Sequence, residues 1–203
     1  MTKKENVSRM RKLVKEFQDS NQTQEAFAMA HGIKKSKLNL LDYQIHKAQE
    51  MIDISYIPMP KGFMYLFAII DVHSRHIVGW SISNSMEAEW VCKCIKEAIH
   101  IYGKPEIINS DQGSQFTSDV YIKLIKSYQT INISMDGKGR AIDNVYIERF
   151  FRTIKYDKLY IEPSKDGLTL YKRCKEFIEY YNKRRLHSSL DYKTPLEVYK
   201  NAA

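Results

Sequence analysis

Apolar and polar residues alternate in two different ways along the chain, and this separates a helical beginning from a longer part built of strands and helices. The first expected helix is marked by four apolar residues at the spacing of one helix face, Met10, Leu13, Val14 and Phe17. Asn21 and Gln24 have the spacing of a capping box. This predicts a second helix that runs through Phe27 to His31, followed by a turn at Gly32.

A third helix is expected after that turn, with lysines at its start: Lys34, Lys35 and Lys37. Positive charges in a first turn oppose the helix dipole, so their place is easier to understand if phosphate groups are nearby. Two helices joined by a short turn, the second of them basic, are typical of a helix-turn-helix that binds DNA. A plain three-helix bundle or an oligomerisation arm fits the same pattern. We expect residues 1–48 to form a helix-turn-helix-like DNA-binding segment.

Strand patterns begin near residue 51. Three runs with the composition of strands are separated by short turns: Met51 to Ile57, Phe63 to Asp71 and His76 to Ser83. Strands this close in sequence favour an antiparallel meander.

Helices and strands alternate in the rest of the chain. Helices are expected at 88–102, at about 118–127, from residue 145 and at 169–185, strands at 106–109 and 131–135, and a last short helix at Pro195. Strands reached through a helix favour parallel neighbours. The order predicts an α/β fold in which a mixed five-stranded sheet is flanked by helices.

Charge is distributed unevenly over these parts. The chain has a net charge of +8. Residues 1–50 carry 10 basic and 6 acidic side chains, residues 51–144 carry 9 and 10, and residues 145–203 carry 13 and 8. Two basic flanks around a slightly acidic centre would suit a protein that holds a polyanion beside a cation-binding site. A solvated lysine and arginine surface is the simpler alternative.

Cysteine usage and hydropathy indicate the cellular compartment of the protein. Cys92, Cys94 and Cys174 form no Cys-x-x-Cys pair and cannot all be bridged, which fits a reducing cytoplasm and argues against a zinc site. The chain has no apolar run long enough to span a bilayer, and no apolar stretch of a signal peptide follows its N-terminus. We therefore expect a cytoplasmic protein without membrane contact.

Three acidic residues stand out by position. Asp53 lies inside the first strand, where a lone carboxylate is costly to bury without a partner or a cation. Asp111 follows the fourth strand at the end where open α/β sheets bind ligands, and Glu148 lies in the first turns of a helix. Three carboxylates from separate elements can hold two hard divalent cations. Spacing alone leaves Asp71 open as a substitute for Asp53, and an aspartate in a turn is usually only a turn former.

Several ordered blocks of sequence resemble the integrase-like catalytic core of bacterial insertion-sequence transposases. They are Asp53-Ile-Ser-Tyr-Ile57, Ala68-Ile-Ile-Asp-Val-His-Ser-Arg-His-Ile-Val-Gly-Trp80, Asn109-Ser-Asp-Gln-Gly-Ser-Gln-Phe-Thr-Ser118, the segment from Ser134 to Lys155, Tyr181-Asn-Lys-Arg-Arg-Leu-His-Ser-Ser-Leu190 and Thr194-Pro-Leu-Glu-Val198. Because these blocks follow one another in order, the resemblance is far more specific than a single short motif.

The resemblance implies a ribonuclease-H-like core over residues 49–203 and assigns Asp53, Asp111 and Glu148 as its catalytic, metal-binding triad. Two Mg²⁺ ions, with Mn²⁺ as a substitute, would serve the attack of water and then of a DNA 3′-hydroxyl on a phosphodiester. Asp71 and Asp143 become structural or supporting residues. The implied activity is that of a transposase that cleaves and joins DNA strands at insertion-sequence ends.

DNA contacts are expected beside the glutamate. Glu148, Arg152 and Lys155 are spaced i, i+4 and i+7, so they share one helix face. Lys138 and Arg140, in the glycine-containing loop before this helix, are further candidates for phosphate contact. The alternative for the helix is a solvated i, i+4 salt bridge, which would contribute only about 0.3–0.5 kcal/mol.

The N-terminal part departs from the family pattern. The run Gln49-Glu-Met-Ile52 stands where the family usually has a tryptophan and a threonine, and the first helices resemble small accessory proteins of insertion sequences. An alternative is therefore a truncated or fused, inactive transposase derivative that binds DNA or assembles with an intact enzyme. A ribonuclease-H-type nuclease fits less well, because the matching blocks continue to Val198. Double-stranded DNA and further copies of the chain are the expected partners.

Overall fold

The computed structural model describes residues 12–13, 16–17, 20, 22–33, 49–135 and 144–201. The chain divides into two compact units, Met1–Lys47 and Ala48–Ala203, and each is considered by itself. In the described part of the chain, no helix has the length and apolar character needed to cross a membrane. All three cysteines are buried and free.

The first unit contains the helix α2, Gln24–Ala30. Its N-cap is Thr23, whose side chain accepts a hydrogen bond from the Ala26 backbone N–H at 3.3 Å. The expected capping box of Asn21 and Gln24 is therefore wrong, because the helix begins at the position where a capping box would place its third residue. A small apolar cluster forms around α2 from Phe27 and Ala28 with Leu13, Phe17 and Ile33.

The basic third helix expected from the sequence, with Lys34, Lys35 and Lys37, falls outside the described residues. The helix-turn-helix therefore stays a prediction.

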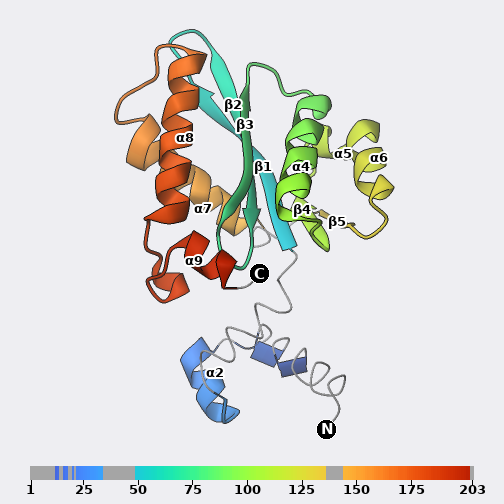
Figure 1. Cartoon of the computed structure of the whole chain (residues 1–203), viewed down its shortest axis with the longest axis vertical. Coiled ribbons are helices and arrows are strands. Elements are labelled where there is room, and N and C mark those ends of the chain that lie inside the picture. The colour runs from blue at the N-terminus through green and yellow to red at the C-terminus, as the bar shows by residue number, and fades with distance from the viewer. Residues whose placement is uncertain are drawn as a thin grey trace. The chain divides into compact units, whose positions relative to one another are not determined.

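The second unit is built on a single five-stranded sheet (Figure 1). Its strands are β1 (Gln49–Pro58), β2 (Phe63–Asp71), β3 (Ile77–Ser83), β4 (Ile107–Ser110) and β5 (Asn132–Met135). The spatial order is β3-β2-β1-β4-β5. The β1–β2 and β2–β3 pairs are antiparallel, whereas β1–β4 and β4–β5 are parallel. The predicted meander and mixed sheet are both confirmed.

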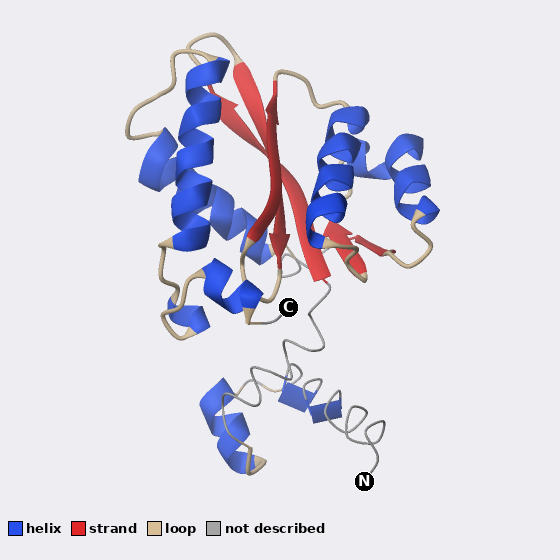
Figure 2. Cartoon of the chain, in the orientation of Figure 1, coloured by secondary structure: helices blue, strands red, loops and turns tan. Residues whose placement is uncertain are grey.

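Helices cover both faces of this sheet (Figure 2). They are α4 (Ala88–Tyr102), α5 (Ser114–Thr117), α6 (Asp119–Ser127), α7 (Val145–Ile154), α8 (Gly167–Lys183) and α9 (Pro195–Lys200), with a π-helical turn η1 (Lys155–Leu159) and a 3-10 turn η2 (Ser188–Leu190). The sequence predicted neither α5 nor η1. A four-residue helix is too short to show a period, and η1 continues the apolar pattern of α7 without a break.

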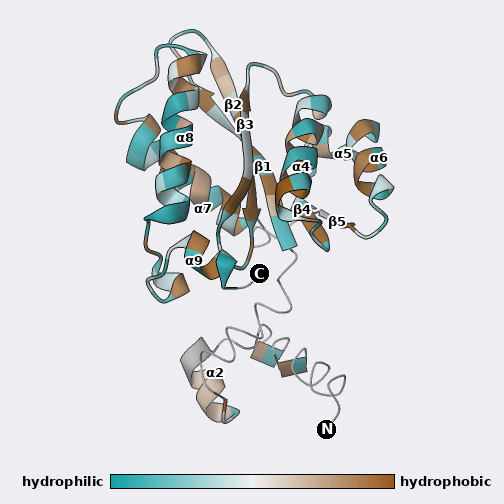
Figure 3. Ribbon diagram, in the orientation of Figure 1, coloured by the Kyte–Doolittle hydropathy of each residue, from teal (hydrophilic) through white to brown (hydrophobic). Residues whose placement is uncertain are grey.

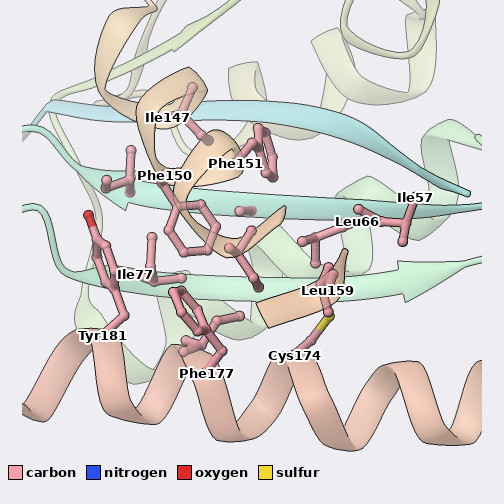
Figure 4. Close-up of a cluster of buried hydrophobic side chains, with 14 of the residues drawn as sticks. Ile57, Leu66, Ile77, Ile147, Phe150, Phe151, Leu159, Cys174, Phe177 and Tyr181 are labelled. Carbon is pink, nitrogen blue, oxygen red and sulfur yellow. The ribbon is translucent and has the colours of Figure 1, made fainter. Parts of the chain in front are cut away.

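Alternation along β1 directs its residues to two different cores. Ile52 and Ile54 belong to a cluster with α4 and α6, whereas Met51 and Ile57 belong to a cluster with α7 and α8. Figure 3 shows apolar strand positions enclosed between amphipathic helices. In the second cluster, Phe150 and Phe151 of α7 lie between the sheet and α8 (Figure 4). The two-residue period of a strand therefore decides which helices each side chain meets.

The C-terminal helices return to the β2–β3 turn. Asn182 of α8 accepts a hydrogen bond from the Ile77 N–H at 2.9 Å and donates one to the Ile77 carbonyl at 3.0 Å. The last helix, α9, begins with a capping box in which Thr194 and Glu197 bond each other's backbone N–H groups. Tyr199 of α9 stacks on buried His76 at 4.9 Å between ring centroids.

Candidate metal and DNA site

Asp53 lies on the α7 side of the sheet. It is two residues from Met51, which packs in the α7 and α8 cluster, so alternation turns both side chains to that face. The carboxylate is half-buried, and its Oδ1 accepts a hydrogen bond from the Ile54 N–H at 2.7 Å. Because β1 is paired with β2 and with β4, this orientation is fixed by register.

Asp111 directly follows β4, the strand that pairs with β1 in parallel. The parallel pairing of β1 with β4 ends at Met51 and Asn109, and the two aspartates each follow two residues later. Neighbouring strands are about 4.8 Å apart, so this register, continued past the end of β4, would bring both acids to one level on adjacent strands. Ile108 packs in the α4 and α6 cluster. Strand alternation would therefore turn Asp111, three residues later, to the face of the sheet that carries Asp53.

The turn after Asp111 is shaped around its carboxylate. Oδ1 of Asp111 accepts a hydrogen bond from the Gly113 N–H at 2.9 Å. A Cβ at position 113 would lie 2.9 Å from that same oxygen, which is closer than real Cβ contacts come. A larger residue at position 113 would therefore require the Asp111 and Gln115 side chains to shift.

Glu148 lies in the first turn of α7 and is exposed. The buried residues of α7 are Ile147, Phe150, Phe151 and Ile154, so Glu148 stands outside the apolar face. Among the described residues, no group of three His, Cys, Asp or Glu side chains is close enough to hold a metal ion. The β1–β4 register runs toward Asp53 and Asp111, but the described structure does not bring the three acids into one ligand group.

Two family models match this chain, both described as integrase core domain, over residues 49–141 and 129–195. The transposase for insertion sequence element IS904 of Lactococcus lactis is 36% identical over 180 residues, which cover 83% of this chain and 69% of that protein. The chain belongs to the integrase-core transposases of insertion sequences. The InsF transposase of the IS3A element of Escherichia coli is 31% identical over 166 residues, or 78% of this chain and 57% of InsF.

Solved structures establish the fold of this transposase core as ribonuclease-H-like. The HTLV-2 integrase catalytic core domain, solved in complex with magnesium, matches 74% of this chain and 94% of its own with a TM-score of 0.58 and 22% identity. The catalytic core domain of BIV integrase matches with a TM-score of 0.59 and 20% identity, over 76% of this chain and 95% of its own. The predicted fold is confirmed.

Lys155, one of the basic residues expected to contact DNA from α7, lies close to Asp53. Lys155 is half-buried at the junction of α7 and η1. Burial lowers the pKa of its ammonium group, and the nearby Asp53 carboxylate opposes that shift. Arg152 remains exposed, and it forms no ion pair with Glu148 in the described structure. The salt bridge considered as an alternative for this helix face is therefore absent there.

Two other expected DNA-binding residues, Lys138 and Arg140, lie outside the described residues, as does Asp143. Two histidines of the core pack against aromatic rings. His76 is buried against Tyr199, and burial lowers its pKa to about 4. His187 lies edge-on to the Tyr181 ring, at 4.9 Å between centroids.

Asp71 has a different surrounding from Asp53 in the transposase core. It pairs with Glu50 across β1 and β2, three residues along from the Asp53–Ala68 pair, so it faces the other side of the sheet. Its Oδ2 accepts hydrogen bonds from both the N–H and the hydroxyl of Ser74. Asp71 therefore holds the β2–β3 turn rather than replacing Asp53.

Glu50 faces Asp71 as a second buried carboxylate. Burial, and then the charge of Asp71, raises the pKa of Glu50 from 4.5 to about 8. Sequence reasoning missed this pair, although both acids lie at the ends of strongly apolar strand patterns, where a buried carboxylate is costly.

The raised pKa of Glu50 predicts the pH dependence of stability. The folded state retains a proton that the unfolded chain loses above about pH 4.5, so the unfolding free energy should fall as the pH rises from 4.5 to 8. A Glu50→Gln variant should lose much of this slope and exceed the wild type in melting temperature at pH 8. Thermal melts between pH 5 and pH 8 measure it. Equal slopes for the two proteins would show that Glu50 is ionised in the folded state at neutral pH.

Proposed function

We propose that this chain catalyses divalent-metal-dependent cleavage and joining of DNA strands at the ends of an insertion sequence. The observation that carries the proposal is the parallel β1–β4 register, which runs toward Asp53 in β1 and toward Asp111 just beyond β4, within a core that belongs to the transposase family. The HTLV-2 relative in fold was solved with magnesium. Glu148 is the third proposed catalytic acid, since it lies on α7, the helix that packs over β1.

The donor set fits Mg²⁺ or Mn²⁺. Asp53, Asp111 and Glu148 offer only carboxylate oxygens, which hard cations prefer, and the three cysteines are buried away as free thiols. A bound cation pair would supply charge stabilisation for the attacking and the leaving oxygen. The carboxylates would orient those cations, and the rigid pairing of β1 holds the first of them in place.

The cations of α7 are proposed to hold the DNA backbone. Arg152 presents its charge to solvent, and Lys155 stands next to Asp53. A phosphate contacted by Lys155 would therefore lie near the acid. The same role is proposed for Lys138 and Arg140, and non-specific phosphate contact for Lys34, Lys35 and Lys37. The substrate would be double-stranded DNA in the bacterial cytoplasm, bound by more than one copy of the chain.

The proposal is tested by incubating the full chain with DNA that carries the ends of its element, with and without Mg²⁺. Cleavage at the ends and strand transfer are expected only with the metal. DNA binding without either reaction would favour the alternative, an inactive derivative that acts as a DNA-binding or co-assembling regulator. This alternative is not favoured, because the relatives are transposases and β1 is paired with both of its neighbours.

Divalent cations should also stabilise the fold. At a metal concentration ten times the dissociation constant, the folded state gains about 1.4 kcal/mol, which corresponds to a rise of roughly 3–6 °C for a chain of this size. Asp111→Asn should remove most of this rise while leaving the metal-free melting temperature nearly unchanged. Thermal melts in Mg²⁺, Mn²⁺ and EDTA measure it. If the variant keeps the full metal-dependent rise, Asp111 is not a ligand.

A further inference from the structure

Arg75 occupies an unusual place in the β2–β3 turn. Its backbone φ is +64°, a left-handed conformation that residues other than glycine rarely adopt. The turn enforces this conformation, because the Arg75 N–H donates to the Asp71 carbonyl at 2.9 Å and Ser74 bonds the Asp71 carboxylate. Such conformations persist only where the surroundings over-determine them.

The conformation aims the Arg75 side chain at α7. Its guanidinium carbon lies 3.4 Å from the centre of the Tyr146 ring, a stacked cation–π contact. Burial lowers the pKa of the guanidinium, and the neighbouring Tyr146, Tyr181 and Asp71 oppose that shift. The side chain is therefore enclosed between the turn, the first helical turn of α7, and α8.

The amino end of α7 has no side-chain cap in the described part of the chain. Its N-cap is Asn144, whose side chain makes no capping hydrogen bond, and the buried Oδ1 of Asn144 has no partner among the described residues. Helix ends normally satisfy their first N–H groups with such a cap. Tyr146 is the second residue of α7, and Glu148 follows two residues later on the exposed side.

We propose that Arg75 is a positioning residue for Glu148. By stacking on Tyr146 it fixes the rotation and height of the first turn of α7 over the sheet, and so sets where the Glu148 carboxylate stands relative to Asp53. A helix turn is rigid, so any movement of Tyr146 moves Glu148 with it. A lysine cannot replace this contact, because stacking uses the flat guanidinium. The inference deepens the proposed function and rests on Glu148 being the third acid.

The chain offers a matched control in Asn182. This residue ties the same β2–β3 region to α8 through two buried hydrogen bonds to Ile77 and does not contact α7 through them. Asn182→Ala should loosen the turn and lower the melting temperature without releasing Tyr146. It therefore separates general weakening of the turn from loss of the Arg75–Tyr146 contact.

The test compares Arg75→Lys, Tyr146→Leu, Tyr146→Phe and Asn182→Ala in the full chain. The first measurement is the Mn²⁺ concentration that gives half of the maximal thermal stabilisation. Arg75→Lys and Tyr146→Leu should each raise it about tenfold, as residues that orient metal ligands commonly do. The double variant should raise it no further, because both changes break one contact. Tyr146→Phe keeps the stacking ring but loses the hydroxyl that also hydrogen-bonds Arg75, so it should raise the value less than Tyr146→Leu, whereas Asn182→Ala should stay near the wild-type value.

The second measurement needs neither metal nor DNA. Backbone amides in the first turns of α7 should exchange with deuterium faster in Arg75→Lys and Tyr146→Leu than in Asn182→Ala, at matched stability. If both variants lower the melting temperature yet match Asn182→Ala in exchange and in Mn²⁺ dependence, Arg75 only stabilises the turn and the inference is overturned. If the wild type shows no Mn²⁺ stabilisation, the proposed metal site fails, and exchange at α7 alone decides whether Arg75 holds the helix.

Discussion

Replacing Asp53 with asparagine is expected to lower the rate of metal-dependent DNA cleavage by about a thousandfold and to leave the fold intact. The variant keeps the size of the side chain but loses a charge needed to hold the cations. Metal ions contribute several kcal/mol of charge stabilisation, and a loss of about 4 kcal/mol corresponds to that factor in rate. Single-turnover cleavage of DNA ends measures it, with circular dichroism to verify the fold.

Asp119→Asn is the matched control for this experiment. Asp119 is an exposed aspartate in the first turn of α6, on the helix that covers the other face of the sheet. Its variant should cleave DNA at the wild-type rate within a factor of two or so, because distant surface changes seldom alter a site. If the Asp53→Asn variant cleaved DNA at the wild-type rate, Asp53 would not belong to the proposed triad.

The largest loss of stability is expected for Phe150→Ala. Phe150 is fully buried, and its ring packs edge-on against Tyr181 at 5.1 Å between centroids. Truncating a buried phenylalanine typically costs about 3–5 kcal/mol, because transfer and cavity terms add. Urea unfolding of the full chain measures the change, which should appear in the transition of the core.

Tyr192→Ala serves as the control for that measurement, because Tyr192 is 72% exposed. Its unfolding free energy should stay within roughly 0.5 kcal/mol of the wild type. A loss below about 1 kcal/mol for Phe150→Ala would mean that α7 does not pack on the sheet as described. The position of Glu148, which lies on α7, would then be unsupported as well.

Strong local patterns explain why much of the fold was predictable. The bounds of β2 and α4 agree with the structure, since a long apolar strand and an amphipathic helix each repeat their period several times. Thr23 was missed as an N-cap because Asn21 offered a competing capping pattern two residues earlier. The wide turn η1 was missed because α-helical and π-helical turns place apolar residues on nearly the same face.

The candidate site was predictable only as far as register and resemblance reach. Alternation along β1 turns Ile52 and Ile54 to one core and Asp53 to the other face, as expected from the sequence. The approach of Lys155 to Asp53 depends on how α7 crosses the sheet, which no local pattern encodes. The Arg75–Tyr146 contact joins positions 71 residues apart (146 − 75), so only the folded chain reveals it.

The order of pairing in the sheet has a consequence for the newly made protein. β1, β2 and β3 are close in sequence and pair with one another, whereas β1 must wait for β4 to complete its other edge. Local pairs form faster than distant ones, and chains fold from the N-terminus as they leave the ribosome. The hairpins that carry Asp53 can thus form before Asp111 or Glu148 has been synthesised. A nascent or prematurely ended chain would lack at least Glu148 of the three proposed acids, so under the proposed function unfinished copies would not cut DNA.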